Sequence, residues 1–155
     1  MRKRNDLLAR RQRSLFVAQI PEEVVTQILK NGNVVLVGSV DGKGIPNISP
    51  RFVLAILDNQ RLLFADAFPN KTFSNLKSWN KVTVAIVDRD TMGGFQLKGV
   101  ASEVEDKELV SQASAKLKEY GIKAKPERAW TLTVNEVYSL KPDSRSKTPL
   151  ITAYG

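Results

Sequence analysis

The 155-residue chain contains no cysteine and no histidine. Without cysteine there are no disulfide bonds, thiolate metal sites or cysteine nucleophiles. Without histidine there is no serine-hydrolase triad, no histidine general base and no histidine-ligated zinc or heme. We therefore expect no metal site and no convincing proton-transfer catalyst, and difficult chemistry would depend on a bound cofactor.

The chain also lacks an apolar run of about eighteen residues, the length that a membrane-spanning helix requires. Its apolar content of 42% fits one globular domain with its own core. We expect a soluble, cytoplasmic protein without membrane insertion.

The net charge of +8 is concentrated near the N-terminus. Residues 1–13 contain six basic residues and one acidic residue, a net charge of +5 that leaves only +3 for the remaining residues. Such an arm is more often a solvated terminus than a binding element, and nucleic acid or anionic lipid is the obvious target if it does bind. We divide the chain into a basic arm (residues 1–19), one domain (20–141) and a C-terminal tail (142–155).

The apolar pattern predicts six strands and two or three short helices. The strands are expected at residues 34–40, 45–57, 61–67, 81–88, 95–104 and 129–140. The helices are expected to begin at Pro21, Asn70 and Asp106, where a proline or a capping side chain opens each amphipathic stretch.

Six strands in hairpin order with flanking helices predict a mainly β fold, a closed or nearly closed antiparallel barrel. Pro46 and Pro50 interrupt the second strand. Proline cannot donate to a β-ladder, so this strand is expected at an edge or a bulge where the backbone is free to meet a ligand. The runs 52–57 and 82–87 barely alternate, which indicates strands covered on both faces. In so short a chain the second cover would be another copy, so we predict a homodimer.

Lys71 occupies an unusual position in the first turn of the second predicted helix, where the helix dipole places partial positive charge. A cation there is explained if a strongly anionic group binds at the same helix end, and phosphate is the usual occupant. Arg51 supplies a second cation from the preceding proline-containing segment. The pair predicts a phosphorylated small ligand, although each residue alone would more often be a surface cation.

Five segments, taken in order and spacing, resemble the pyridoxamine 5′-phosphate oxidase-like family of FMN-binding split β-barrels. These segments are Val34–Val40 (VVLVGSV), Gly44–Arg51 (GIPNISPR), Leu63–Ala67 (LFADA), Asn70–Lys77 (NKTFSNLK) and Phe95–Gly99 (FQLKG). The resemblance implies a six-stranded, Greek-key-like antiparallel split barrel. It also implies a homodimer with FMN in a cleft between the subunits.

The resemblance further implies which residues bind FMN. They are Asn47, Ser49, Pro50, Arg51, Ala65, Asp66, Ala67, Asn70, Lys71, Thr72, Gln96 and Trp130. Arg51, Lys71 and Thr72 would hold the phosphate. Along the flavin ring would lie Asn47, Ser49 and Pro50, and residues 65–67 would flank the ring and the ribityl chain. Gln96 would reach the flavin from the partner subunit, and Trp130 would close the pocket. Each of these residues also has a purely structural explanation. Asn47, Ser49 and Pro50 could form a turn or bulge, Gln96 could be a solvated strand residue, and Trp130 could pack in the core.

As a function, the resemblance implies an FMN-dependent oxidoreductase. After Trp130 the chain lacks the arginine-rich substrate segment of true pyridoxamine phosphate oxidases, so oxidation of pyridoxine or pyridoxamine phosphate is not expected. The alternatives are a flavin carrier without turnover, a reductase that binds the deazaflavin F420, and a nucleic-acid-binding β-barrel. The last would use the basic arm, with Phe68, Phe73 or Trp79 as stacking platforms.

Overall fold

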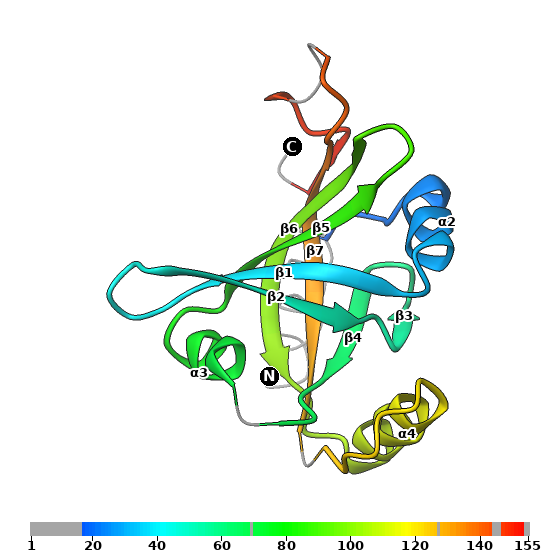
Figure 1. The fold of residues 1–155 in the computed structure, drawn as a ribbon. Helices are drawn as coiled ribbons and strands as arrows, with labels where there is room; N and C mark the ends of the chain where they lie inside the picture. The colour runs from blue at the N-terminus through cyan, green and yellow to red at the C-terminus, as the bar shows by residue number, and fades with distance from the viewer. Residues whose placement is uncertain (1–16, 69, 127, 144–146, 154–155) are drawn as a thin grey trace, which may run out of the picture.

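The computed structural model of the chain describes residues 17–68, 70–126, 128–143 and 147–153. These residues form one curved antiparallel sheet with three flanking helices, consistent with a split barrel (Figure 1). Residues 1–16 of the predicted basic arm lie outside the described residues. Ala18 is part of the core, and its backbone N–H donates to the carbonyl oxygen of Val134 at 2.8 Å.

The sheet has the strand order β2-β1-β5-β6-β7-β4-β3, and β8 pairs with β7. The strands are β1 Val34–Val40, β2 Pro46–Phe52, β3 Ala55–Leu57, β4 Arg61–Ala65, β5 Lys81–Asp88, β6 Gly93–Glu103, β7 Ala129–Ser139 and β8 Ile151–Thr152. Val53 and Leu54 join β2 to β3, the two ends of this order. The backbone N–H of Val53 donates to the carbonyl oxygen of Asn33 at 2.8 Å, and that of Leu54 donates to the carbonyl oxygen of Leu63 at 2.9 Å. The chain itself therefore bridges the opening of the barrel.

Two elements correct the sequence prediction, and the described strands number eight rather than six. Residues 45–57 were expected to form one strand, but β2 pairs with β1 whereas β3 pairs with β4, so the segment is divided at Val53–Leu54. A continuous apolar run carries no signal for such a change of partner. The predicted C-terminal tail contains β8, which pairs with Glu136 and Val137 of β7.

The main hydrophobic core lies inside the curved sheet. Phe64 of β4 and Trp130 of β7 are its largest side chains, and their rings stack with centroids 4.3 Å apart. Helix α2 (Glu22–Lys30) covers one side through Val24 and Ile28, which lie one turn apart and are both buried. The apolar spacing of this helix therefore produces the packing that the sequence predicted.

Helix α4 (Lys107–Glu119) covers a second, smaller core over β4 and β7. Asp106 caps it as predicted, because its side chain accepts the backbone N–H groups of Glu108 and Leu109. Beyond the helix, the Tyr120 ring stacks on Phe52 at a centroid distance of 4.7 Å. Its hydroxyl accepts a hydrogen bond from the side chain of Asn33, so the end of α4 is tied to β2 and to the residue that precedes β1.

Helix α3 (Lys71–Ser78) lies against β1 and β2 and begins where the sequence predicted. Asn70 is its cap, with the side-chain oxygen 3.1 Å from the backbone nitrogen of Phe73. The helix buries two polar side chains, Thr72 and Asn75, against the strands. Figure 1 shows α3 beside the β1–β2 hairpin, away from α2 and α4.

The outer face of the sheet exposes several apolar side chains. Ile48 of β2 is 71% exposed, and Val34 and Leu36 of β1 are more than one third exposed. In the single chain, β5 alternates between buried and less buried positions, and the described residues provide no second cover for its outer face. The homodimer stays a prediction. Within the described ranges, no helix is long and apolar enough to cross a membrane.

Candidate functional site

A network of polar side chains joins edge strand β2 to α3. The hydroxyl groups of Ser49 and Thr72 are 2.8 Å apart, and the Asn47 side-chain amide donates to the Thr72 hydroxyl at 3.3 Å. From α3, the Asn75 amide donates to the hydroxyl of Ser39 on β1 at 3.0 Å. Thr72 is only 1% exposed. These side chains therefore position the helix on the hairpin, and the Thr72 hydroxyl has two hydrogen-bond partners on β2.

The second part of the site is an ion pair between β2 and the end of β4. Arg51 Nη2 lies 3.5 Å from Asp66 Oδ1, and the side chains are 17% and 7% exposed. The Asn70 amide donates to the same carboxylate oxygen at 3.2 Å. The cap of α3 is thus held on the carboxylate that faces Arg51. Two predicted site residues from distant segments therefore meet beside the start of α3.

This ion pair leaves hydrogen-bonding capacity unused. Four buried atoms have no hydrogen-bond partner among the described residues. They are Arg51 Nε, Arg51 Nη2, Asp66 Oδ2 and the indole nitrogen of Trp130. Buried polar groups are normally satisfied, because an unpaired donor or acceptor costs about 1–3 kcal/mol. The guanidinium is held through Nη1, which donates to the carbonyl oxygen of Pro50 at 3.0 Å. The arrangement fits a small polar group placed between Arg51 and Asp66.

Burial raises the pKa of the Asp66 carboxyl, because desolvation penalises its charged form more than its neighbours stabilise that form. The opposing contributions come from the Asn70 hydrogen bond and the Arg51 charge, with smaller ones from the Trp130 indole N–H, which is close to the carboxyl without meeting hydrogen-bond geometry, and from the Arg128 charge. The Arg51 guanidinium therefore compensates only part of the cost of burying a charged Asp66.

Lys71 is the first residue of α3, and its side chain is exposed. No acidic side chain lies in the first turn of the helix. The positive end of the helix dipole, Lys71 and Arg51 therefore all favour an anion near Asn70.

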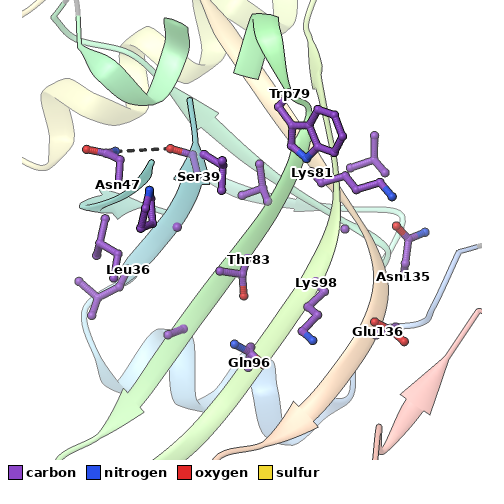
Figure 2. Close-up of a pocket in the computed structure, with 18 residues that line it drawn as sticks. Leu36, Ser39, Asn47, Trp79, Lys81, Thr83, Gln96, Lys98, Asn135 and Glu136 are labelled. Atoms are coloured by element: carbon purple, nitrogen blue, oxygen red, sulfur yellow. Dashed lines mark hydrogen bonds between the residues drawn. The ribbon is translucent and has the colours of Figure 1, made fainter. Parts of the chain in front are cut away.

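A groove of about 710 Å³ crosses the outer face of the sheet from β2 to β7 (Figure 2). Gln96 and Asn47 are the two predicted site residues that line it. Part of its floor is Gly38, where an added Cβ would lie 2.6 Å from Thr83 Cγ2. Trp79, the residue after α3, stands at one end and is 56% exposed (Figure 2). Arg51, Asp66 and Lys71 do not line this groove.

The groove contains charged residues that sequence reasoning missed, namely Lys81, Lys98 and Glu136. Lys98 precedes a β-bulge at Gly99, where a Cβ would overlap the carbonyl oxygen of Thr133. The Lys98 ammonium lies 4.6 Å from the centre of the Tyr138 ring, and burial raises the pKa of Tyr138. The spacing from Gln96 to Lys98 signals a shared face, because alternate residues of a strand point the same way.

The remaining predicted residues lie elsewhere. Trp130 is 1% exposed and packs on Phe64, so its ring belongs to the core and only its indole N–H faces the Asp66 region. Ala65 packs in the smaller core under α4, and Ala67 lies at its edge. Pro50 is exposed on edge strand β2. The structure therefore separates the predicted residues into a cluster at the start of α3, a groove and a core set.

The chain matches the pyridoxamine 5′-phosphate oxidase family over residues 20–141 and belongs to that family. An uncharacterised protein of Methanocaldococcus jannaschii is 28% identical over 132 residues, which are 83% of this chain and 87% of that protein. The family assignment confirms the resemblance seen in the five sequence segments.

Two solved structures illustrate the range of proteins with this fold. An FMN-binding protein of Syntrophomonas wolfei superposes with a TM-score of 0.66 at 18% identity, covering 89% of this chain and 94% of that one. HutZ, the heme storage protein of Vibrio cholerae, superposes with a TM-score of 0.57 at 15% identity, covering 77% and 94% of the respective chains. At these identities the similarity shows the fold alone.

Proposed function

We propose that this chain is an FMN-binding flavoprotein that acts as a homodimer in hydride or electron transfer. The observation that carries the proposal is the Arg51 guanidinium beside the start of α3, whose buried Nε and Nη2 donors find no hydrogen-bond partner in the described part of the chain. Those two nitrogens form the fork that matches phosphate oxygens. The exposed Lys71 and the dipole of α3 add positive potential at the same place.

In this proposal the protein supplies position and electrostatics. Arg51 and Lys71 bind the phosphate, and the bonds from Asn47 and Ser49 to Thr72 hold α3 at a fixed distance from β2. Thr72 thus acts as a positioning residue, which differs from the direct phosphate contact that the resemblance implied. The bound flavin would supply the capacity to accept and release hydride or electrons.

A second copy of the chain would complete the site. Gln96 lies in the outer groove, whereas Arg51 and Asp66 lie at the start of α3 and do not line that groove. The Gln96 of one subunit and the phosphate cluster of the other would then serve the same cofactor. The exposed Ile48 and Leu36 border the groove and offer apolar surface for this contact.

FMN is favoured over heme by the donor set of the chain. Heme iron is usually held by histidine, cysteine, methionine or tyrosine, and this chain has no histidine and no cysteine. Among the described residues, Met92 is 80% exposed at the β5–β6 turn, the Tyr120 hydroxyl is bound to Asn33, and the Tyr138 ring lies under the Lys98 ammonium. We therefore do not propose that this chain binds heme, although HutZ, which has the same fold, is a heme storage protein.

The test is to denature the purified protein and identify the released chromophore by mass, first for the natural chain and then for an Arg51→Ala, Lys71→Ala double variant. The natural chain should release FMN, and the double variant should release much less. An Arg61→Ala, Lys116→Ala variant removes two exposed cations from other surfaces and should retain FMN. Equal release from all three proteins would show that Arg51 and Lys71 do not bind the phosphate.

Released F420 would identify the deazaflavin alternative. Tight, salt-sensitive binding of nucleic acid by a protein that carries no flavin would favour the barrel with a basic arm. Deleting residues 1–13 separates these possibilities, because FMN binding should survive the deletion and nucleic-acid binding should not.

A further inference from the structure

Asp66 presents a difficulty for any anion at the start of α3. Its side chain is 7% exposed, its Oδ1 lies 3.5 Å from Nη2 of the guanidinium that would bind the phosphate, and its charge would repel a phosphate group placed there. If Asp66 served only to neutralise Arg51, close and mutual hydrogen bonds would be expected. Among the described residues, Arg51 Nε, Arg51 Nη2 and Asp66 Oδ2 instead have no partner within hydrogen-bond geometry, and the Trp130 indole N–H is the neighbouring donor on the Asp66 side. The carboxylate therefore faces Arg51 without satisfying it.

The unused atoms are complementary to a phosphate monoester if Asp66 carries a proton. Arg51 Nε and Nη2 would donate to two phosphate oxygens. Oδ2 of a protonated Asp66 would donate to a phosphate oxygen, whereas an ionised carboxylate can only accept. Oδ1 would keep the hydrogen bond from Asn70 that it already accepts, so the cap of α3 need not move.

We propose that Asp66 is the proton-linked element of this site, and that a phosphate monoester bound by Arg51 is held together with one proton on the Asp66 carboxyl. The inference rests on the proposed function, because it concerns the same phosphate site. It makes Asp66 a specificity residue, since a flavin without the phosphate has no group for the protonated carboxyl to contact.

The groups around Asp66 agree with this assignment. Arg51 faces it from β2, Asn70 from the start of α3, and Trp130 and Arg128 from β7 and the loop before it. Arg128 also lies over the Phe73 ring at 4.8 Å from its centre. Burial by itself already raises the pKa of the carboxyl and makes it easier to protonate. A phosphate dianion nearby would raise the pKa of the carboxyl further, because it repels the charged form.

The experiment measures proton uptake when FMN binds to the full chain freed of flavin. Calorimetric titrations at about pH 8 in two buffers of different ionisation enthalpy give the number of protons taken up, at a pH where a phosphate monoester with a pKa of about 6 is already a dianion. Wild-type protein should take up close to one proton with FMN and none with riboflavin. Its FMN affinity should fall by up to about tenfold for each unit of pH above this value.

Asp66→Asn is the decisive variant, because the amide keeps the shape of the side chain and offers a permanent N–H donor. It should bind FMN more tightly than wild type at about pH 8 and without proton uptake. Asp88→Asn is the matched control, since Asp88 lies on β5 in an ion pair with Lys30, and it should behave as wild type.

The outcomes separate the two proposals. Equal affinities of wild type for FMN and riboflavin would remove the phosphate site and this inference with it. Preferred binding of FMN without proton uptake, or with the same uptake in Asp66→Asn, would leave the phosphate site intact and overturn the role of Asp66. If Asp66→Asn does not fold, Asp66→Ser, which also lacks the carboxyl, takes its place: loss of the proton uptake with FMN supports the role of Asp66, and unchanged uptake overturns it. If only water binds to Arg51 Nε, Arg51 Nη2 and Asp66 Oδ2, FMN and riboflavin would cause the same proton uptake, and the inference would be overturned.

Discussion

The hydroxyl of Ser49 on β2 lies 2.8 Å from that of Thr72 on α3, and both belong to the segments that resemble an FMN-binding family. A threonine at the start of a helix usually indicates a cap or a ligand contact. In this chain Asn70 is the cap, and the buried Thr72 hydroxyl connects the helix to the edge strand. The contact determines where α3 directs its N-terminus, and therefore where Lys71 and the helix dipole act.

Replacement of Thr72 by valine should destabilise the fold by about 1–3 kcal/mol, because the Asn47 amide and the Ser49 hydroxyl lose their common partner while they are partly buried. Urea denaturation gives the change in the free energy of unfolding. Ser74→Ala, at an exposed position of the same helix, should change it by less than about 0.5 kcal/mol. Equal effects of the two substitutions would contradict the assigned role of Thr72.

Gly99→Ala should disturb the β-bulge within the pairing of β6 with β7, because its Cβ would overlap the carbonyl oxygen of Thr133. Overpacking against a rigid backbone costs about 1–3 kcal/mol or more, so the thermal midpoint should fall by several degrees. Gly42→Ala, where the added Cβ meets nothing within 4 Å, is the control and should leave the midpoint nearly unchanged. A stable Gly99→Ala protein would show that the bulge adapts without cost.

Ile48→Glu tests the proposed second copy. This side chain is 71% exposed beside the groove, and a charge there would be buried without a partner if another subunit covered it. Light scattering should show a dimer for wild type and a monomer for the variant, with loss of FMN from the monomer. Met92→Glu, at an exposed turn outside the groove, should remain dimeric. A dimer that tolerates Ile48→Glu would place the interface elsewhere.

The stability of the flavin-free protein should carry a pH dependence that originates at Asp66. Burial raises the pKa of this carboxyl above its ordinary value of 3.8, so the native state binds more protons than the unfolded chain at pH values between the two. The free energy of unfolding therefore falls as pH rises through that window. Asp66→Asn lacks this loss, so its stability relative to wild type should increase from about pH 4 upward and then level off.

Asp88→Asn gives the opposite sign and serves as the comparison. The Thr91 hydroxyl holds the pKa of Asp88 below its ordinary value, with help from Lys30. The stabilisation from Asp88 is present above the ordinary pKa and is lost as pH falls through the lowered one. Urea denaturation across the same pH series measures both variants. A wild-type-minus-Asp66→Asn difference that does not change with pH would rule out the assigned burial effect.

Much of the fold follows from local patterns in the chain. The strands Val34–Val40 and Lys81–Asp88, and the caps Asn70 and Asp106, are found where the sequence predicts them. Capping and turn chemistry depend on residues within a few positions of one another, so they are visible without tertiary structure. The division of residues 45–57 and the pairing of β8 depend on partners far along the chain, and no local pattern reveals them.

The candidate site divides in the same way. The sequence by itself determined the donor set: no histidine or cysteine, a lysine at the first turn of α3, and an arginine on a proline-containing strand. Only the tertiary structure decided that Arg51 faces the buried Asp66, that Thr72 is satisfied by β2, and that Trp130 packs in the core. The physical reason is that residue type fixes which bonds a side chain can make, whereas burial and partners across the sheet select which of those bonds form.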